Sequence, residues 1–187
     1  MKGEWCYYKS YFSSDYCDSI LEKSKNLTFQ RGTIGGNGNM VNNNIRKSEV
    51  AWIYPQDFPQ LYEELWKLER EANKEWFGFH VDHLQSIQLA KYDGNINAEY
   101  KRHQDVFWIN NNTRHRKLTA IVQLSNPDTY VGGEFNLFDC DEYPNPEDIK
   151  QQGTVIFFPS FIFHQAKPVT SGIRYSLASW FEGPKWR

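Results

Sequence analysis

The chain has 187 residues, a formal net charge of −2 and 40% hydrophobic residues. We expect one domain over residues 1–187, with helical support at about 1–80 and a β-rich core at about 81–187. Because basic residues are spread along the chain and no apolar run reaches the roughly 20 residues of a membrane span, the sequence speaks against nucleic-acid and membrane partners.

Cysteine content and aromatic content narrow the class of protein. The three cysteines lack metal-type spacing, and the chain begins without an apolar signal segment, so we expect a cytoplasmic protein with reduced thiols. The seven Trp, eleven Tyr and thirteen Phe favour strands over a helical bundle.

Two helices are expected in the first 80 residues. Ser13-Ser14-Asp15 is typical of a helix start, and Asn26 ends the partly apolar segment that follows. From Asp57 to about Trp76, apolar residues recur at three- and four-residue steps, which predicts a longer amphipathic helix. The Gly- and Asn-rich stretch 31–44 is expected to be a mobile loop leading into a strand over 45–53.

After residue 80 the pattern changes to short apolar or alternating segments between Gly-, Asn- and Pro-bearing turns. The expected strands are 83–92, 100–108, 118–124, 134–138, 154–158, 163–169 and 175–181. They predict a mainly β fold with flanking helices, a sandwich or jelly roll whose helices pack outside one sheet. The basic run 114–117 is interpreted as a solvated loop with an exposed His115.

A candidate metal site lies within these strands. His103 and Asp105 are two residues apart in an expected strand, so their side chains project from one face. His164 follows a second strand 61 residues after His103, and only the fold could bring it near the pair. Two His and one carboxylate leave open metal positions, as in non-haem Fe(II) oxygenases. We therefore nominate His103, Asp105 and His164 as metal ligands.

Two other patterns offer competing sites. His80-Val-Asp-His83 contains nitrogen and oxygen ligands, but in an extended segment His83 would point away from the other two side chains. A structural or surface role is favoured there. The glycines of 32–38 lack the Lys-Ser/Thr of a phosphate-binding loop.

The C-terminal half carries a family pattern made of Gly153 to Ser160, His164, Pro168 to Gly172, Arg174-Tyr-Ser176 and Trp180. It resembles the double-stranded β-helix of the 2-oxoglutarate oxygenases, in the prolyl 4-hydroxylase-like branch. The resemblance extends back through Tyr92-Asp-Gly94, Tyr100 to Asp105, 117–124 and Gly132-Gly-Glu-Phe135, and more faintly to Ile45-Arg46 and Trp52-Ile53. It covers roughly residues 85–182 and implies a double-stranded β-helix.

The resemblance implies a co-substrate site. Arg174 occupies the place of the basic residue that binds the C5 carboxylate of 2-oxoglutarate, and its planar fork suits a carboxylate. Ser176 and Tyr92 would add hydroxyl donors. The strand 118–124 lacks the Tyr that some prolyl hydroxylases use against the co-substrate, so Thr119, Gln123 or no residue takes that part.

The resemblance also implies an Fe(II)- and 2-oxoglutarate-dependent dioxygenase that consumes O2, with ascorbate as an optional reductant. Its expected substrate is a prolyl residue in a peptide or protein, with Trp108, Trp180 and Arg46 nominated as substrate-binding residues; a core aromatic would look the same as Trp180. Asp105 favours hydroxylation, because halide-installing relatives carry a small apolar residue there. In this branch the 31–44 stretch corresponds to a flap over the active site, and a plain solvent loop is the alternative.

Three alternatives stay open at this point. One is an oxygenase of the same kind that acts on a free amino acid or small metabolite. The others are a non-catalytic metal-binding jelly-roll module and a cupin-like Zn or Mn protein, which would bind metal without 2-oxoglutarate.

Overall fold

The structure is a computed structural model that describes residues 1–35, 40–109 and 112–186. Its helices are α1 (Ser14–Lys23), α2 (Pro59–Ala72) and α3 (Pro146–Ile149), with 3-10 turns at Ser24–Asn26, Gly94–Ile96 and Pro127–Thr129 and a π turn at Asn73–Phe77. Its strands are β1 (Cys6–Tyr8), β2 (Gln30–Arg31), β3 (Glu49–Ile53), β4 (His83–Leu84), β5 (Ile87–Asp93), β6 (Tyr100–His103), β7 (Arg114–Gln123), β8 (Tyr130–Gly132), β9 (Phe135–Leu137), β10 (Val155–Pro159), β11 (His164–Ala166) and β12 (Val169–Pro184).

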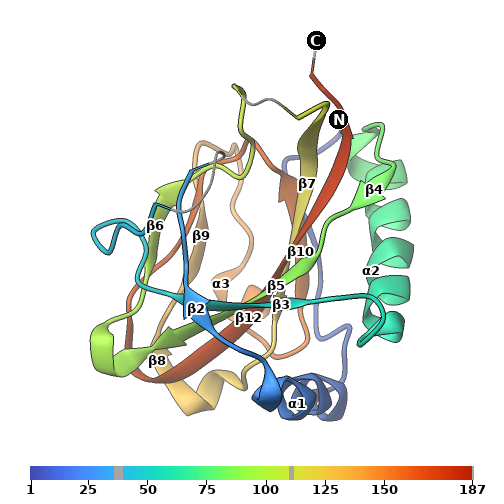
Figure 1. Cartoon of the computed structure of the whole chain (residues 1–187). Helices are drawn as coiled ribbons and strands as arrows, with labels where there is room; N and C mark the ends of the chain where they lie inside the picture. The colour runs from blue at the N-terminus through green and yellow to red at the C-terminus, as the bar shows by residue number, and fades with distance from the viewer. Residues whose placement is uncertain (36–39, 110–111, 187) are drawn as a thin grey trace.

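The strands form a large and a small antiparallel sheet. The large sheet has the order β1-β10-β7-β12-β5-β3-β2, with β4 and β8 also paired to β12, and the small sheet has the order β6-β11-β9. Helices α1 and α2 lie on one side of the large sheet, and β6 and β9 lie on the other side (Figure 1). The expected fold class, a mainly β jelly roll with helices outside one sheet, is confirmed. None of the helices in the described residues is long and apolar enough to span a membrane.

Both expected helices form, and local chemistry explains their ends. The Ser13 side chain accepts a hydrogen bond from the Tyr16 backbone N–H at 3.2 Å, which caps the start of α1. Proline at the first position of α2 needs no helical hydrogen-bond donor there. The buried face of α2 packs on the large sheet through Leu61 and Leu65.

The two faces of the large sheet differ because side chains alternate along its strands. One face carries the apolar core, and the other carries polar side chains that face the small sheet. On β7, Leu118, Ala120 and Val122 join the apolar core under the helices. The intervening residues Thr119 and Gln123 are buried on the opposite face, where they make hydrogen bonds to Asp105 and Arg174. Because side chains alternate across a strand, one run of ten residues supports the core and equips the space between the sheets.

The strand boundaries differ from expectation in several places. The predicted strand 100–108 ends at His103, 83–92 is divided between β4 and β5, and 45–53 becomes regular only at Glu49. Strands β1 and β8 and helix α3 were not predicted. The stretch 31–44 contains a bridge between Ile34 and Met40, and its residues 36–39 lie outside the described part of the chain.

The interpretation of residues 114–117 as a solvated loop is wrong. These residues form the first part of β7, paired with the end of β12. His115 is only 5% exposed and Lys117 is buried, with its ammonium group 3.5 Å from the centre of the Trp186 ring. The aromatic face and the neighbouring strand stabilise cationic side chains that a polar loop would have left in water.

Glu69 on α2 gives the fold a pH-dependent weak point. Its side chain is 2% exposed and burial raises its pKa to about 7, while an unfolded glutamate titrates near 4.5. The contribution of Glu69 to stability is therefore greatest below the unfolded pKa and is lost as the pH rises through about 7. We expect Glu69→Gln to raise the free energy of unfolding at pH 8 by on the order of 1–3 kcal/mol and to change it little at pH 4.

Thermal or urea unfolding at the two pH values measures this effect. Glu63→Gln on the exposed face of the same helix is the matched control and should leave stability unchanged at both. A Glu69→Gln variant that is no more stable than wild type at pH 8 contradicts the prediction.

Candidate metal centre

His103, Asp105 and His164 converge at the small sheet. His103 ends β6, His164 begins β11, and the two residues are direct partners across this antiparallel pair. Asp105 follows β6 and is positioned by its backbone N–H, which donates to the Ser160 carbonyl at 2.9 Å. Strand pairing thus brings His103 and His164 together although they are far apart in sequence.

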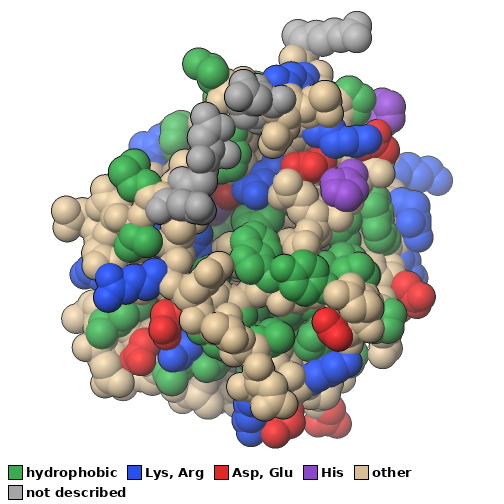
Figure 2. All heavy atoms as spheres, viewed as in Figure 1, with side chains coloured by type: hydrophobic (Ala, Val, Ile, Leu, Met, Phe, Trp, Pro, Cys, Tyr) green, Lys and Arg blue, Asp and Glu red, His purple; other side chains and the backbone are tan. Residues whose placement is uncertain are grey.

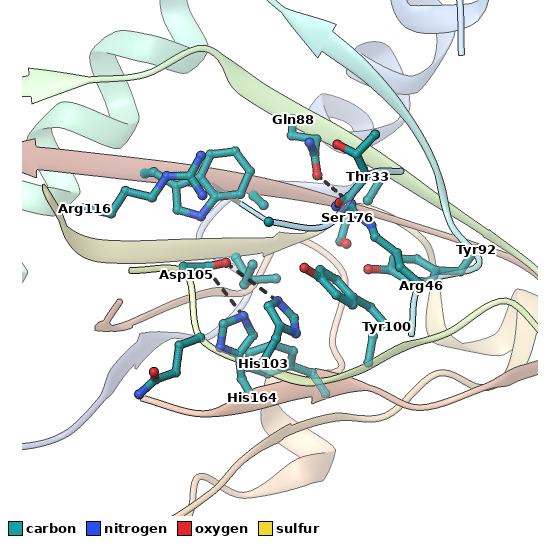
Figure 3. A pocket seen from close by; sticks show the side chains of 18 of the residues that line it. Thr33, Arg46, Gln88, Tyr92, Tyr100, His103, Asp105, Arg116, His164 and Ser176 are labelled. Carbon is teal, nitrogen blue, oxygen red and sulfur yellow. Dashed lines mark hydrogen bonds and ion pairs between the residues drawn. The ribbon is translucent and has the colours of Figure 1, made fainter. Parts of the chain in front are cut away.

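The three side chains present ligand atoms to one point. Nε2 of His103 lies 3.6 Å from Oδ1 of Asp105, and Nε2 of His164 lies 3.4 Å from Oδ2 of the same carboxylate. One ligand atom from each residue lies within 4.8 Å of the others. Figure 3 shows the three side chains pointing toward one another. Two imidazoles and one carboxylate at this spacing fit a metal ion that prefers nitrogen and oxygen ligands.

Hydrogen bonds from the backbone fix both imidazoles for this role. Nδ1 of His103 lies 2.8 Å from the Lys101 carbonyl oxygen, and Nδ1 of His164 lies 3.0 Å from that of Ile162. When each Nδ1–H donates to its carbonyl, the lone pair of each Nε2 faces the centre. Burial, reinforced by the His164 ring, lowers the pKa of His103 to about 3, so this imidazole is neutral at neutral pH.

The carboxylate is held as well. Thr119 Oγ1 donates to Oδ2 of Asp105 at 2.9 Å and lies 3.0 Å from the Ser160 hydroxyl. Burial alone would raise the pKa of Asp105, but the adjacent His164 and His103 outweigh it and lower the pKa to about 2. Asp105 is therefore ionised and oriented.

The cluster lies at one wall of a cavity of about 220 Å³ between the two sheets. Arg174, Ser176 and Tyr92, the three residues expected to bind the co-substrate, line the same cavity from neighbouring strands of the large sheet. This volume is below the roughly 300–1,000 Å³ of pockets that enclose drug-sized ligands. It suits a small acid beside one inserted side chain.

Arg174 is 2% exposed and held in place on two sides. Its Nη2 donates to Gln123 Oε1 at 2.7 Å, and its guanidinium carbon lies 5.3 Å from the centre of the Tyr92 ring. Among the described residues it forms no ion pair. An arginine buried with only neutral partners has unused donors for an anion that arrives in the cavity.

Two of the three candidate substrate-binding residues line the cavity. Arg46 and Trp180 line the cavity, whereas Trp108 does not and is 51% exposed, with its ring 6.0 Å from that of His115. Sequence reasoning missed Arg116, which also lines the cavity and stacks on Trp180. The available signal was that Arg116 lies between His115 and Lys117, which alternate with it directly before the apolar segment 118–124. This pattern extends the expected strand toward the N-terminus.

The competing metal site does not assemble. Asp82 pairs with Arg114, and of the residues that the structure describes only His103, Asp105 and His164 form a group with metal-type spacing. The segment around His80 and His83 instead pairs with the end of β12.

Comparison with known proteins agrees with this geometry. The profile of the 2OG-Fe(II) oxygenase superfamily matches residues 87–182. A PKHD-type hydroxylase of Shewanella sp. strain MR-7 is 31% identical over 127 residues, which are 68% of this chain and 44% of that protein. The chain thus spans less than half the length of this relative.

Solved structures with the same fold include prolyl hydroxylases. A prolyl-4-hydroxylase of Pseudomonas putida superposes with a TM-score of 0.72 at 19% identity, over 98% of this chain and 94% of that one. A Trichoplax adhaerens prolyl hydroxylase, solved with a peptide of a hypoxia inducible factor, has a TM-score of 0.74 at 20% identity and covers 96% and 83%. These likenesses concern the fold.

Proposed function

The chain belongs to the 2OG-Fe(II) oxygenase superfamily, and on this premise we propose that it is an Fe(II)- and 2-oxoglutarate-dependent dioxygenase that hydroxylates prolyl residues in a peptide or protein. The observation that carries the proposal is the shared cavity, in which the His103, Asp105 and His164 cluster faces the same space as Arg174.

The three clustered residues would hold the iron. Bound Fe(II) supplies the activation of O2 that couples decarboxylation of 2-oxoglutarate, to succinate and CO2, with hydroxylation of the substrate. The Lys101 and Ile162 carbonyls keep both imidazoles in the ligating tautomer, and Thr119 keeps the carboxylate in place. These contacts are made before any ligand arrives, so little reorganisation accompanies binding.

Arg174 would bind the far carboxylate of 2-oxoglutarate. Its guanidinium is fixed by Gln123, and Ser176 lies two residues further along the same face of β12. When an arginine fork holds the far end of this dianion, it fixes the position and orientation of the keto-acid end. The buried walls of the cavity exclude water from that position.

The proposed prolyl substrate is supported by the relatives and by the cavity. The structural neighbours named above are prolyl hydroxylases, and one was solved with a peptide. A cavity of about 220 Å³ admits a side chain presented from outside more readily than a whole large metabolite. Hydroxylation of a free amino acid or small metabolite is the second candidate, since such molecules also fit this volume.

The test incubates the protein with Fe(II), 2-oxoglutarate, O2 and proline-containing peptides, with and without ascorbate. Succinate formation and a mass gain of one oxygen atom on the peptide are the expected products. The same peptides with alanine in place of proline are the matched control. Product from free proline alone would favour the small-molecule candidate. The oxygenase proposal would be rejected if none of the substrates gave succinate and the protein did not bind 2-oxoglutarate.

A further inference from the structure

Arg116 is held rigidly at the wall of the cavity that Arg174 also lines. Its Nε and Nη2 both donate to Oε1 of Gln85, at 3.1 and 2.9 Å, and Gln85 Nε2 donates to Glu182 at 2.5 Å. The guanidinium carbon lies 3.8 Å from the centre of the Trp180 ring. Glu182 therefore orients Gln85, and Gln85 and Trp180 together fix the fork of Arg116. In Figure 3, Arg116 and Arg46 lie on either side of Asp105.

The cavity contains positive charge that the described protein does not neutralise. Arg46, Arg116 and Arg174 line it, and among the described residues none of the three forms an ion pair. Arg46 donates only to neutral acceptors, namely Ser48 Oγ at 2.7 Å, the Thr33 carbonyl at 3.2 Å and Gln88 Oε1 at 2.7 Å. A buried cation without an anionic partner is costly, which indicates that the partner arrives with a ligand.

The two carboxylates that act on Arg116 are already engaged. Asp105 belongs to the metal cluster and Glu182 accepts the hydrogen bond from Gln85. Burial lowers the pKa of Arg116 despite the opposing charges of Asp105 and Glu182. An incoming anion would add to the stabilisation that these two engaged carboxylates provide.

The cavity lining keeps a net positive charge and unused N–H donors after Fe(II) and 2-oxoglutarate bind. The lining carries three arginines and one aspartate, a formal charge of +2, and Fe(II) with the 2-oxoglutarate dianion adds no net charge. Arginine has five N–H donors, and the contacts to Gln85 use Nε and Nη2 alone, so Nη1 has no hydrogen-bond partner among the described residues.

We propose that the primary substrate carries a carboxylate next to the group that is oxidised, and that Arg116 binds this carboxylate while Arg46 adds positive charge to the same cavity. This rests on the proposed function, because it assigns the second anion after 2-oxoglutarate has taken Arg174. The carboxylate belongs either to an acidic side chain adjacent to the hydroxylated residue or to a free carboxyl terminus. A planar guanidinium binds either through two parallel hydrogen bonds.

The test measures peptide dissociation constants, without oxygen, on the protein with Fe(II) and 2-oxoglutarate. One blocked peptide carries Glu beside proline and its counterpart carries Gln, and a third peptide has no acidic side chain but a free carboxylate on the proline itself. We expect at least tenfold tighter binding of one carboxylate peptide than of the Gln peptide, a preference that weakens with added salt. The arm that binds identifies the source of the carboxylate.

Protein variants assign the preference to Arg116. Arg116→Gln should reduce the preference to less than threefold, and Arg116→Lys should retain part of it. Arg114→Gln, two residues away on β7 and paired with Asp82, is the matched control and should keep it. Where a variant fails to fold, the three peptides still show on the wild-type protein whether a carboxylate is preferred.

Equal affinity for charged and neutral peptides, or a full preference in folded Arg116→Gln, overturns this proposal. Its failure is distinct from failure of the proposed function. If the protein prefers carboxylate peptides through Arg116 but forms no succinate in air, the carboxylate site is supported and the hydroxylase proposal is rejected. If neutral and charged peptides give succinate equally, the hydroxylase proposal is supported and the carboxylate site is rejected.

Discussion

Replacement of His164 by alanine should abolish the visible absorption band that forms when Fe(II) and 2-oxoglutarate are added to the protein without oxygen. His164 is 4% exposed and contributes one of three ligand atoms that lie within 4.8 Å of one another. Its removal leaves one imidazole and one carboxylate, which cannot hold the metal against water. Anaerobic titration with Fe(II) followed by spectroscopy measures the effect, and we expect no detectable band and no succinate formation.

The control for this variant is His83→Ala. His83 is exposed on β4 and belongs to the short His80 to His83 segment that competes with the assigned site in sequence. We expect the band of this variant to match wild type in intensity and in the Fe(II) concentration required. A band that survives in His164→Ala and disappears in His83→Ala would move the metal site to the N-terminal side of β5 and reject the assignment.

The candidate metal residues could be predicted from sequence because their chemistry is uncommon and their context is specific. A His-x-Asp pair followed by a distant His is weak evidence by itself, and the resemblance of the segment from Gly153 to Trp180 to the oxygenase family supplied the context. What could not be predicted is how Asp105 is placed. The strand ends at His103, so Asp105 reaches the metal position through its bonds to Ser160 and Thr119 and not through strand alternation.

The second arginine of the cavity shows the opposite case. Arg116 lies in a run of basic residues after several asparagines, and such composition is typical of solvated loops. The structure buries its neighbours His115 and Lys117 by adding four residues to the start of β7, where the end of β12 provides pairing partners. The determinant is the length of a strand that lies more than 50 residues away in sequence, which no local pattern contains.

The amide side chains that hold the arginines of the cavity were equally hard to assign. Gln85, Gln88 and Gln123 each hold one of the three arginines through a side-chain oxygen. Glutamine gives little signal in sequence, because it is mostly exposed in folded proteins. Gln123 was considered for the co-substrate wall, and the structure places its oxygen on Arg174 at 2.7 Å.

Arg174→Gln should raise the 2-oxoglutarate concentration needed for half of the Fe(II) absorption band by about 30- to 1,000-fold, which corresponds to roughly 2–4 kcal/mol. Arg174 is buried, carries no ion pair among the described residues and is the cation that faces the metal cluster from β12. Loss of its charge leaves the distal carboxylate of 2-oxoglutarate desolvated without a partner. The metal ligands are untouched, so Fe(II) should still bind.

Two further variants separate charge from geometry at this position. Arg174→Lys keeps the charge but loses the planar fork, so we expect an intermediate requirement for 2-oxoglutarate. Arg102→Gln removes an arginine that is about half exposed and paired with Asp139, and it should leave the requirement unchanged. Since Arg174 also holds Gln123, thermal unfolding of each variant must show a folded protein. A folded Arg174→Gln that forms the band at wild-type 2-oxoglutarate concentrations would assign the distal carboxylate to another group, and Arg46 would be the first to replace.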